Sequence, residues 1–235
     1  MGLELLGTQN QLVQKIHETG VPTIVVLVGG RPLSVNWIAQ NVQALVQAWE
    51  PGSLGGRALA NILTGKVNPS AKLPISIPRH SGQIQMIYNH KPSQYFHKYI
   101  DGPSTPLYPF GFGLSYTRFD YSGLKLSHAK ISVLDSFTAS IELTNVGNRE
   151  GTEVVQLYIR DVYSSATRPV KELKDFTRVT LKPGEKKTVT FTVTPDKLAY
   201  WNRNMQYGVE KGEFEIMIGS SSQDKDLKKV KIEVI

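Results

Sequence analysis

The sequence contains no cysteine among its 235 residues. Disulfide bridges and thiolate chemistry are therefore excluded, and the cellular compartment stays open because a protein without cysteine tolerates oxidising and reducing conditions alike. Long apolar runs are also missing, since Val21–Gly30 is too short to cross a bilayer and is bounded by glycines. The first residues, MGLELLGTQNQ, show no basic stretch or apolar core of a signal peptide. We therefore expect no membrane partner.

Acidic residues are fewer than basic ones, 20 against 27, which gives a net charge of +7. A basic protein binds nucleic acid when its charge is clustered beside a recognisable reading motif. The lysines here fall in turns or alternate with apolar residues along expected strands, as do Lys182, Lys186, Lys187, Lys228, Lys229 and Lys231. We therefore expect no nucleic-acid partner and interpret these lysines as solvated or edge-protecting.

The first third of the chain alternates between helical and strand-like patterns. Apolar spacing and glycine stops predict a helix over Asn10–Thr19, a strand over Val21–Val28 covered on both faces, a strand over Val42–Trp49, a helix over Gly56–Leu63 and a strand over Leu73–Pro78. This order predicts a mostly parallel sheet covered by helices. Three strands are few for such a sheet, so we expect the α/β part to be incomplete, with a small complete domain as the alternative.

From Phe119 onward, apolar and polar residues alternate with a period of two. The expected inward faces are Phe137, Ala139, Ile141 and Leu143; Val155, Leu157 and Ile159; Val189, Phe191 and Val193; Phe214, Ile216 and Ile218; and Val230, Ile232 and Val234. Turn signals separate these segments, and no helix signal interrupts them. About seven short strands in about 120 residues predict an all-β, immunoglobulin-like or fibronectin-III-like sandwich.

Two stretches carry a family resemblance. LYPFGFGLSYT (Leu107–Thr117) and AWEPGSLGGRALANILTGKVNPSAKLPISIP (Ala48–Pro78) resemble glycoside hydrolase family 3, the β-glucosidase and β-xylosidase family. Ala71 departs from the glycine that many members carry there, and Ser164–Glu185 resembles a loop and strand of the family's fibronectin-III-like domain. The resemblance implies the C-terminal part of the α/β sandwich domain at 1–79, an aromatic-rich loop and interdomain join at 80–117, and a fibronectin-III-like domain at 118–235.

The resemblance also says where the chemistry resides. Retaining glycosidases use two carboxyl groups about 5 Å apart. In the family the nucleophile is an aspartate of an N-terminal barrel, and the acid/base is a glutamate upstream of the segment that Glu4 matches. We therefore assign no catalytic residue, no substrate-binding residue and no cofactor to this chain. The expected partners are the missing barrel and, in the complete enzyme, a β-glucoside.

Three alternatives remain open at this point. The parent enzyme is expected to hydrolyse terminal non-reducing β-D-glucosides and to be periplasmic or secreted, although this chain's own compartment is undetermined. A β-xylosidase is the alternative within the enzyme class. Outside that class, the chain is a non-enzymatic structural module or one that binds carbohydrate or a partner.

Other candidate residues have ordinary interpretations beside the functional ones. Asp101 lies in a KYID element and is expected to support a loop, and Glu50 is expected to be a solvated glutamate at a sheet edge where α/β ligands bind. The histidines His80, His90 and His97 are too widely spaced to predict a metal site.

Aromatic and basic side chains are the remaining candidates. Two interpretations are open for Tyr88, Tyr95, Phe96 and Tyr99. These aromatic side chains either stack on a sugar ring or pack to anchor the long loop, and packing is favoured. The basic side chains of Arg168, Lys171 and Lys174 are long enough to reach a neighbouring surface, but we expect them to lie in a solvated loop.

Glycine motifs supply no chemistry here. Gly65-Lys66 lacks a phosphate loop's earlier glycine, because Ala60 stands there, and Gly111-Phe112-Gly113 is followed by Tyr116 rather than the last glycine of a dinucleotide fingerprint. We expect Gly111 and Gly113 to let the backbone pass closely against a neighbouring element in a joint between the two domains.

Overall fold

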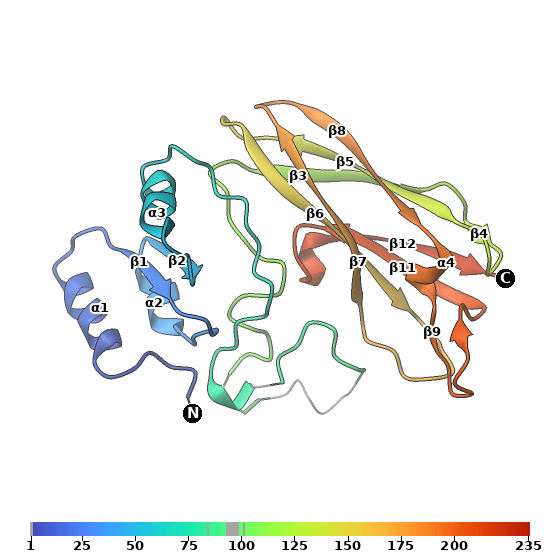
Figure 1. Ribbon diagram of the computed structural model, residues 1–235, viewed down its shortest axis with the longest axis horizontal. Coiled ribbons are helices and arrows are strands. Elements are labelled where there is room, and N and C mark those ends of the chain that lie inside the picture. Colours follow the sequence, from blue (N-terminus) through green and yellow to red (C-terminus); the bar gives the residue numbers. More distant parts are fainter. Residues whose placement is uncertain (1, 84, 93–98, 101) are drawn as a thin grey trace. The chain divides into compact units, whose positions relative to one another are not determined.

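The computed structural model describes residues 2–83, 85–92, 99–100 and 102–235 (Figure 1). The chain divides into two compact units, and neither is one continuous stretch of sequence. The first unit comprises Met1–Val67, Ile75–Met86 and Lys98–Pro109, and the second comprises Asn68–Pro74, Ile87–His97 and Phe110–Ile235. The predicted boundaries at 79 and 117 remain predictions derived from the resemblance.

The first unit contains helices around two parallel strands. Its elements are α1 (Gln9–Glu18), β1 (Ile24–Val28), α2 (Asn36–Asn41), β2 (Ala44–Trp49), α3 (Gly55–Leu63) and the 3-10 turn η1 (Ser81–Gln83). The helices predicted from Asn10 and Gly56 are confirmed, and glycines in the left-handed region follow both, Gly20 at φ 77° and Gly65 at φ 72°. Among the described residues, no helix combines the length and apolarity needed to cross a bilayer.

Two strand predictions in this unit need correction. Among the described residues, β1 pairs in parallel with β2 alone, and of the β1 side chains only Leu27 is buried, so the strand is not covered on both faces. Leu73–Pro78 is not a strand: its pairing is the isolated bridge between Ile77 and Tyr108. Pro74 and Pro78 have no backbone N–H and cannot continue a ladder. Helix α2 was not predicted, because six residues are too few for a clear period of 3.6.

The second unit is built on two β-sheets, which confirms the β-rich half. The larger sheet has the order β4-β12-β11-β6-β7 and the smaller one β3-β5-β8. The strands are β3 (Phe119–Leu126), β4 (Lys130–Ile131), β5 (Phe137–Asn145), β6 (Gly151–Asp161), β7 (Glu172–Leu181), β8 (Lys186–Val193), β11 (Gly212–Gly219) and β12 (Leu227–Val234). A one-turn helix, α4 (Pro195–Leu198), precedes a hairpin of β9 (Tyr200–Trp201) and β10 (Tyr207–Gly208), and η2 (Asp224–Asp226) precedes β12.

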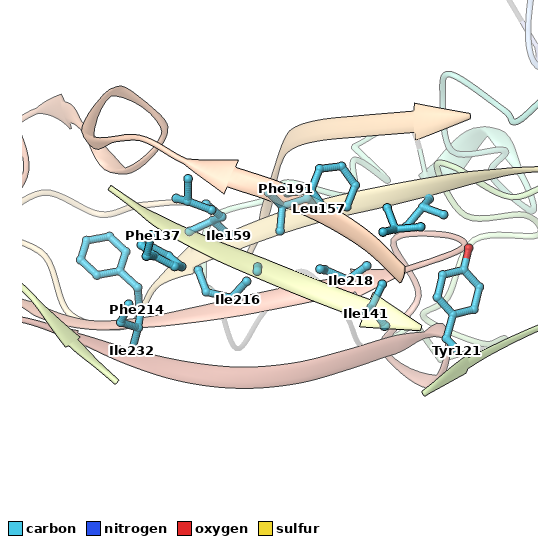
Figure 2. Close-up of a cluster of buried hydrophobic side chains, with 14 of the residues drawn as sticks. Tyr121, Phe137, Ile141, Leu157, Ile159, Phe191, Phe214, Ile216, Ile218 and Ile232 are labelled. Atoms are coloured by element: carbon cyan, nitrogen blue, oxygen red, sulfur yellow. The ribbon is translucent and has the colours of Figure 1, made fainter. Parts of the chain in front are cut away.

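One apolar core lies between the two sheets. Figure 2 shows side chains of β6 and β11 directed toward those of β5 and β8, among them Leu157, Ile216, Ile141 and Phe191. The strand faces predicted from alternation are these inward faces, and all of their residues are buried except Val230, which is partly buried. Each fully buried Leu, Ile or Phe contributes roughly 1.5–3 kcal/mol relative to exposure, so this core is the main source of the unit's stability.

Candidate functional site

The first candidate is formed by two segments of the second unit that precede its strands, Asn68–Pro74 and the stretch from Phe110 to Thr117. We call this pair the joint. Its two segments are bonded to each other through the backbone, because Leu73 N–H donates to Phe112 O at 2.7 Å and Gly111 N–H donates to Leu73 O at 2.8 Å. The family string and the Lys-Leu-Pro motif therefore form one structure.

The glycines of the aromatic string allow a close backbone approach. Gly111 has φ +78°, and a Cβ added there would lie 2.1 Å from Oε1 of Gln156 on β6. A Cβ added at Gly113 would lie 2.2 Å from the carbonyl oxygen of Ala71. Real Cβ atoms do not approach other atoms this closely, so a side chain at either position forces a displacement. The expectation that these glycines let the backbone pass closely is confirmed.

Asn68, in the Asn-Pro-Ser motif, binds three partners in the second unit. Its Oδ1 accepts from the Ser115 hydroxyl at 2.9 Å and from Tyr116 N–H at 2.8 Å, while its Nδ2 donates to Glu150 O at 2.9 Å. An amide has both acceptor and donor ends, which a carboxylate or an aliphatic side chain of this size lacks. Asn68 thus fastens both halves of the joint to the turn before β6.

A largely buried ion pair lies beneath the joint. Lys72 Nζ is 2.8 Å from Glu153 Oε1 on β6, and the Tyr121 hydroxyl donates to the same oxygen at 3.1 Å. Burial, and then the negative charge of Glu153, raises the pKa of Tyr121 well above its ordinary value. This phenol stays protonated and serves Glu153 as a donor rather than as an acid.

The aromatic side chains of the long loop divide by location. Tyr88 stacks on Phe110 with ring centroids 4.1 Å apart, meets Tyr158 edge-on, and accepts a hydrogen bond from Leu173 N–H at 3.2 Å. Packing is therefore the correct interpretation of Tyr88. In the first unit, Tyr99 meets His80 edge-on at 5.6 Å. Tyr95 and Phe96 lie outside the described residues.

Of the three carboxylates singled out from the sequence, the structure describes Glu4 and Glu50. Glu4 is exposed, and hydrogen bonds from its own N–H and from the Ser81 hydroxyl lower its pKa, whereas a general acid needs a raised one. Glu50 is exposed and lies over Gly30, where an added Cβ would be 2.8 Å from its Oε1. Asp101 lies outside the described residues.

The prediction that Arg168, Lys171 and Lys174 lie in a solvated loop is wrong. Arg168 Nη2 is 2.6 Å from Glu172 Oε2, and its guanidinium lies 4.4 Å from the centre of the Tyr200 ring. Lys171 is buried and bonds Asp224 Oδ1 at 2.6 Å. The third cation, Lys174, is 3.6 Å from Glu172. These cations stay within the sandwich because their carboxylate partners come from strands and turns that the fold brings to them.

The remaining candidates hold no metal cluster in the described part of the chain. His80 belongs to the first unit and His90 to the second, and His97 lies outside the described residues. A search of the described residues finds no group of three or more potential side-chain ligands. A surface groove of about 490 Å³ between the edge strands β7 and β8 is lined by threonine, lysine, phenylalanine and valine together with Arg178 and Asp175, and Asp175 is bonded to Lys197.

The buried carboxyl of Asp161, like that of Glu153, was not predicted from the sequence. Asp161 ends β6, and its side chain is only 2% exposed. Burial, partly offset by the charge of Arg168, raises its pKa to about 6. A carboxyl without access to solvent cannot reach a sugar, so this shift does not mark a reaction centre. An aspartate at the end of an alternating strand gives no signal of its burial.

Comparison with known proteins gives the family. Residues 1–116 match the glycosyl hydrolase family 3 C-terminal domain, and residues 153–222 match the fibronectin type III-like domain. A β-xylosidase of Formosa agariphila is 46% identical over 99% of this chain and 32% of its own length, and a periplasmic β-glucosidase of Salmonella typhimurium is 44% identical over 92% and 29%.

The solved structures agree. A β-glucosidase from Erythrobacter marinus superposes with a TM-score of 0.95 at 44% identity over all of this chain, and a β-glucosidase from Listeria innocua in complex with glucose gives 0.91 at 36% over 99%. This chain spans 31% and 34% of those two chains, about a third of each. These matches show that the chain belongs to glycoside hydrolase family 3 and is homologous to the C-terminal part of its β-glucosidases and β-xylosidases.

Proposed function

We propose that this chain is the C-terminal part of a β-glucosidase-like enzyme that hydrolyses terminal, non-reducing β-D-glucosides with retention, and that the chain alone is inactive. The observation that carries the proposal is coverage: the chain matches about a third of each relative, 32% of the β-xylosidase and 29% of the periplasmic β-glucosidase. In the described residues no exposed pair of carboxylates offers a nucleophile beside an acid of raised pKa.

The proposed partner is an N-terminal barrel that carries the nucleophile, in the same polypeptide or a separate one. The first unit supports the view that part of its own α/β fold lies outside this chain, because among the described residues β1 and β2 each have one neighbouring strand. A two-stranded sheet is marginally stable in water by itself. Large apolar side chains of this unit are also exposed, namely Leu6, Leu12, Ile16, Val21, Ile24, Val28, Leu54, Leu63, Val67 and Ile75. More strands and more apolar cover would complete such a unit.

The sugar has two candidates, because the matched relatives include both activities at nearly equal identity, 46% for the β-xylosidase and 44% for the periplasmic β-glucosidase. Selection of the sugar depends on contacts that the proposal assigns largely to the barrel. Hydrolysis of β-xylosides is therefore the alternative within the same reaction class.

Complementation tests the proposal. The chain is co-expressed with the N-terminal portion of the Salmonella typhimurium relative, up to the start of the matched region, and release of nitrophenol from aryl β-glucoside and aryl β-xyloside is measured. We expect no turnover by either part alone and turnover by the two together. A matched control carries Lys72→Met to weaken the sandwich. Turnover by the purified chain alone, with contaminating glycosidases excluded, would contradict the proposal.

A second candidate follows from an exposed aromatic pair on the β9–β10 hairpin. Trp201 and Tyr207 face each other across the two strands with ring centroids 5.4 Å apart, and both are more than half exposed. Exposed rings offer an apolar face on which a sugar can stack. As a non-enzymatic module, the chain would bind cellulose oligomers or xylan without turnover. Calorimetry of the chain and of Trp201→Ala tests this, and a flat isotherm for the unmodified chain rejects it.

A further inference from the structure

The end of β6 carries a cluster of charged groups from several elements. Arg168 lies at its centre, with Nη1 3.8 Å from Asp161 Oδ2 and Nη2 2.6 Å from Glu172 Oε2. Lys174 of β7 is 3.6 Å from Glu172, and Glu210, before β11, accepts hydrogen bonds from the N–H and hydroxyl of Ser165 at 3.0 and 2.6 Å. The Tyr200 ring of β9 covers the guanidinium.

Within this cluster Asp161 is the least satisfied group. Its side chain is 2% exposed, and no donor in the described part of the chain bonds to Oδ2. The nearest nitrogen of Arg168, at 3.8 Å, is beyond hydrogen-bonding distance. The ionised form of this carboxyl is stabilised by the N–H of Tyr163 and by the more distant charge of Arg168. The negative charges of Glu210 and Glu172 destabilise that form. A buried carboxylate with so little solvation is costly in its ionised form.

The three carboxyls of this cluster, those of Asp161, Glu172 and Glu210, differ in their contacts. Glu172 is bonded directly to Arg168, and Glu210 to Ser165, and these contacts lower the pKa of both. Asp161 has no such contact at Oδ2, and burial raises its pKa to about 6. Of the three carboxyls, Asp161 is therefore the one expected to take up a proton first as the pH falls.

Arg168, at the centre of this cluster, belongs to the segment between β6 and β7, residues 162–171, and contacts Asp161 and Glu172 at the segment's two ends. The segment is also fastened from outside: Val170 N–H donates to His90 O at 2.9 Å, and Arg203 Nη2 donates to Ser165 O at 3.0 Å. Lifting the segment would remove Arg168 and expose Asp161 to water, where a carboxyl binds its proton less tightly. A proton that binds the closed form more tightly than the open form favours closure.

We propose that Asp161 is a proton-operated latch, which holds residues 162–171 on the sandwich more firmly when its carboxyl is protonated than when it is ionised. The latch extends to the long loop, because the segment is bonded to His90 and, through Thr167, to Lys91. Mild acid thus tightens the attachment of the loop that carries Tyr88.

Hydrogen exchange of the 235-residue chain tests the latch, with the amides of β5 as an internal reference. After correction for the intrinsic pH dependence of exchange, we expect opening of 162–171 to increase about tenfold from pH 5 to pH 7.5, because one group changes its proton affinity on opening. In Asp161→Asn, which keeps the shape of the side chain without the titration, this increase should vanish. The exposed carboxylate of β3 supplies the matched control, Asp120→Asn, which should retain it.

Two results would overturn the latch: corrected opening that does not change with pH in the unmodified chain, or a pH-dependent increase that survives in Asp161→Asn. If Asp161→Asn fails to fold, titration of the Asp161 carboxyl carbon by NMR in the unmodified chain decides. A midpoint near 6 supports the latch, and a midpoint near 4 rejects it.

Discussion

The two compact units differ in how they use apolar residues. In the second unit, side chains from both sheets meet in one core, where Ile141, Leu157 and Ile216 are completely buried. In the first unit, comparable side chains remain open to solvent, with Leu12 60% and Val28 64% exposed. Because hydrophobic burial is the main driving force of folding, the sandwich has the means to be stable by itself. The first unit has the composition of a domain but not the covered faces of one.

The largest expected effect tests this contrast directly. Leu157→Ala leaves a cavity between the sheets, so we expect it to lower the free energy of unfolding by about 2–5 kcal/mol. Leu12→Ala, on the exposed side of α1, should change it by less than about 0.5 kcal/mol. Urea denaturation followed by fluorescence measures both. Equal losses from the two variants would mean that the units are equally well packed.

The next largest effect comes from the ion pair beneath the joint. Lys72→Met should cost about 3 kcal/mol, because it leaves Glu153 charged and buried beside Tyr121. The double variant Lys72→Met with Glu153→Met should recover much of that loss, since no uncompensated charge remains. Lys15→Met, which breaks an exposed ion pair on α1, is the control and should have a small effect. A similar loss from the two lysine variants would contradict the burial argument.

The pH dependence of stability isolates Asp161. Its folded pKa, about 6, is raised above the unfolded value of 3.8, so its stabilising contribution is complete below pH 3.8 and is lost as pH rises through 6. Asp161→Asn should therefore match the unmodified chain near pH 4 and exceed it by about 1–3 kcal/mol at pH 7. Parallel denaturation curves across this range measure the difference. A constant difference between the two proteins would contradict the assignment.

The smallest effect distinguishes close contact from backbone conformation at two glycines. Both Gly111 and Gly184 have positive φ, but an added Cβ meets Gln156 at Gly111 and nothing within 4 Å at Gly184. We expect Gly184→Ala to cost about 1 kcal/mol from backbone strain alone and Gly111→Ala about 2 kcal/mol. Thermal denaturation of the pair tests the difference. If Gly184→Ala costs as much, the close approach at Gly111 has no energetic consequence.

The sequence predicted secondary structure best where it depends on neighbouring residues in the same segment. Alternation from Phe137 to Leu143 requires only a strand with one buried face, and the structure has that face. Leu73–Pro78 was misassigned because its apolar residues resemble a strand, whereas its prolines limit the backbone pairing to isolated positions. The environment of Arg168 and Lys171 could not be foreseen, since Lys171 and its partner Asp224 are 53 residues apart in sequence. The family motifs indicated where the joint lies. They did not indicate which groups form its hydrogen bonds, because the bonded residues are about 40 positions apart in the sequence.

The position of Asn68 and Lys72 within the second unit has a consequence for how this protein can be divided. A clone that starts where the strands start, near Phe119, would leave Glu153 without its cation and Glu150 O without its amide donor. The sandwich therefore cannot be cut from the chain at its first strand, because the seven upstream residues 68–74 belong to the same compact unit. Recombination that exchanges such sandwiches between enzymes has to carry this short piece of the preceding domain as well.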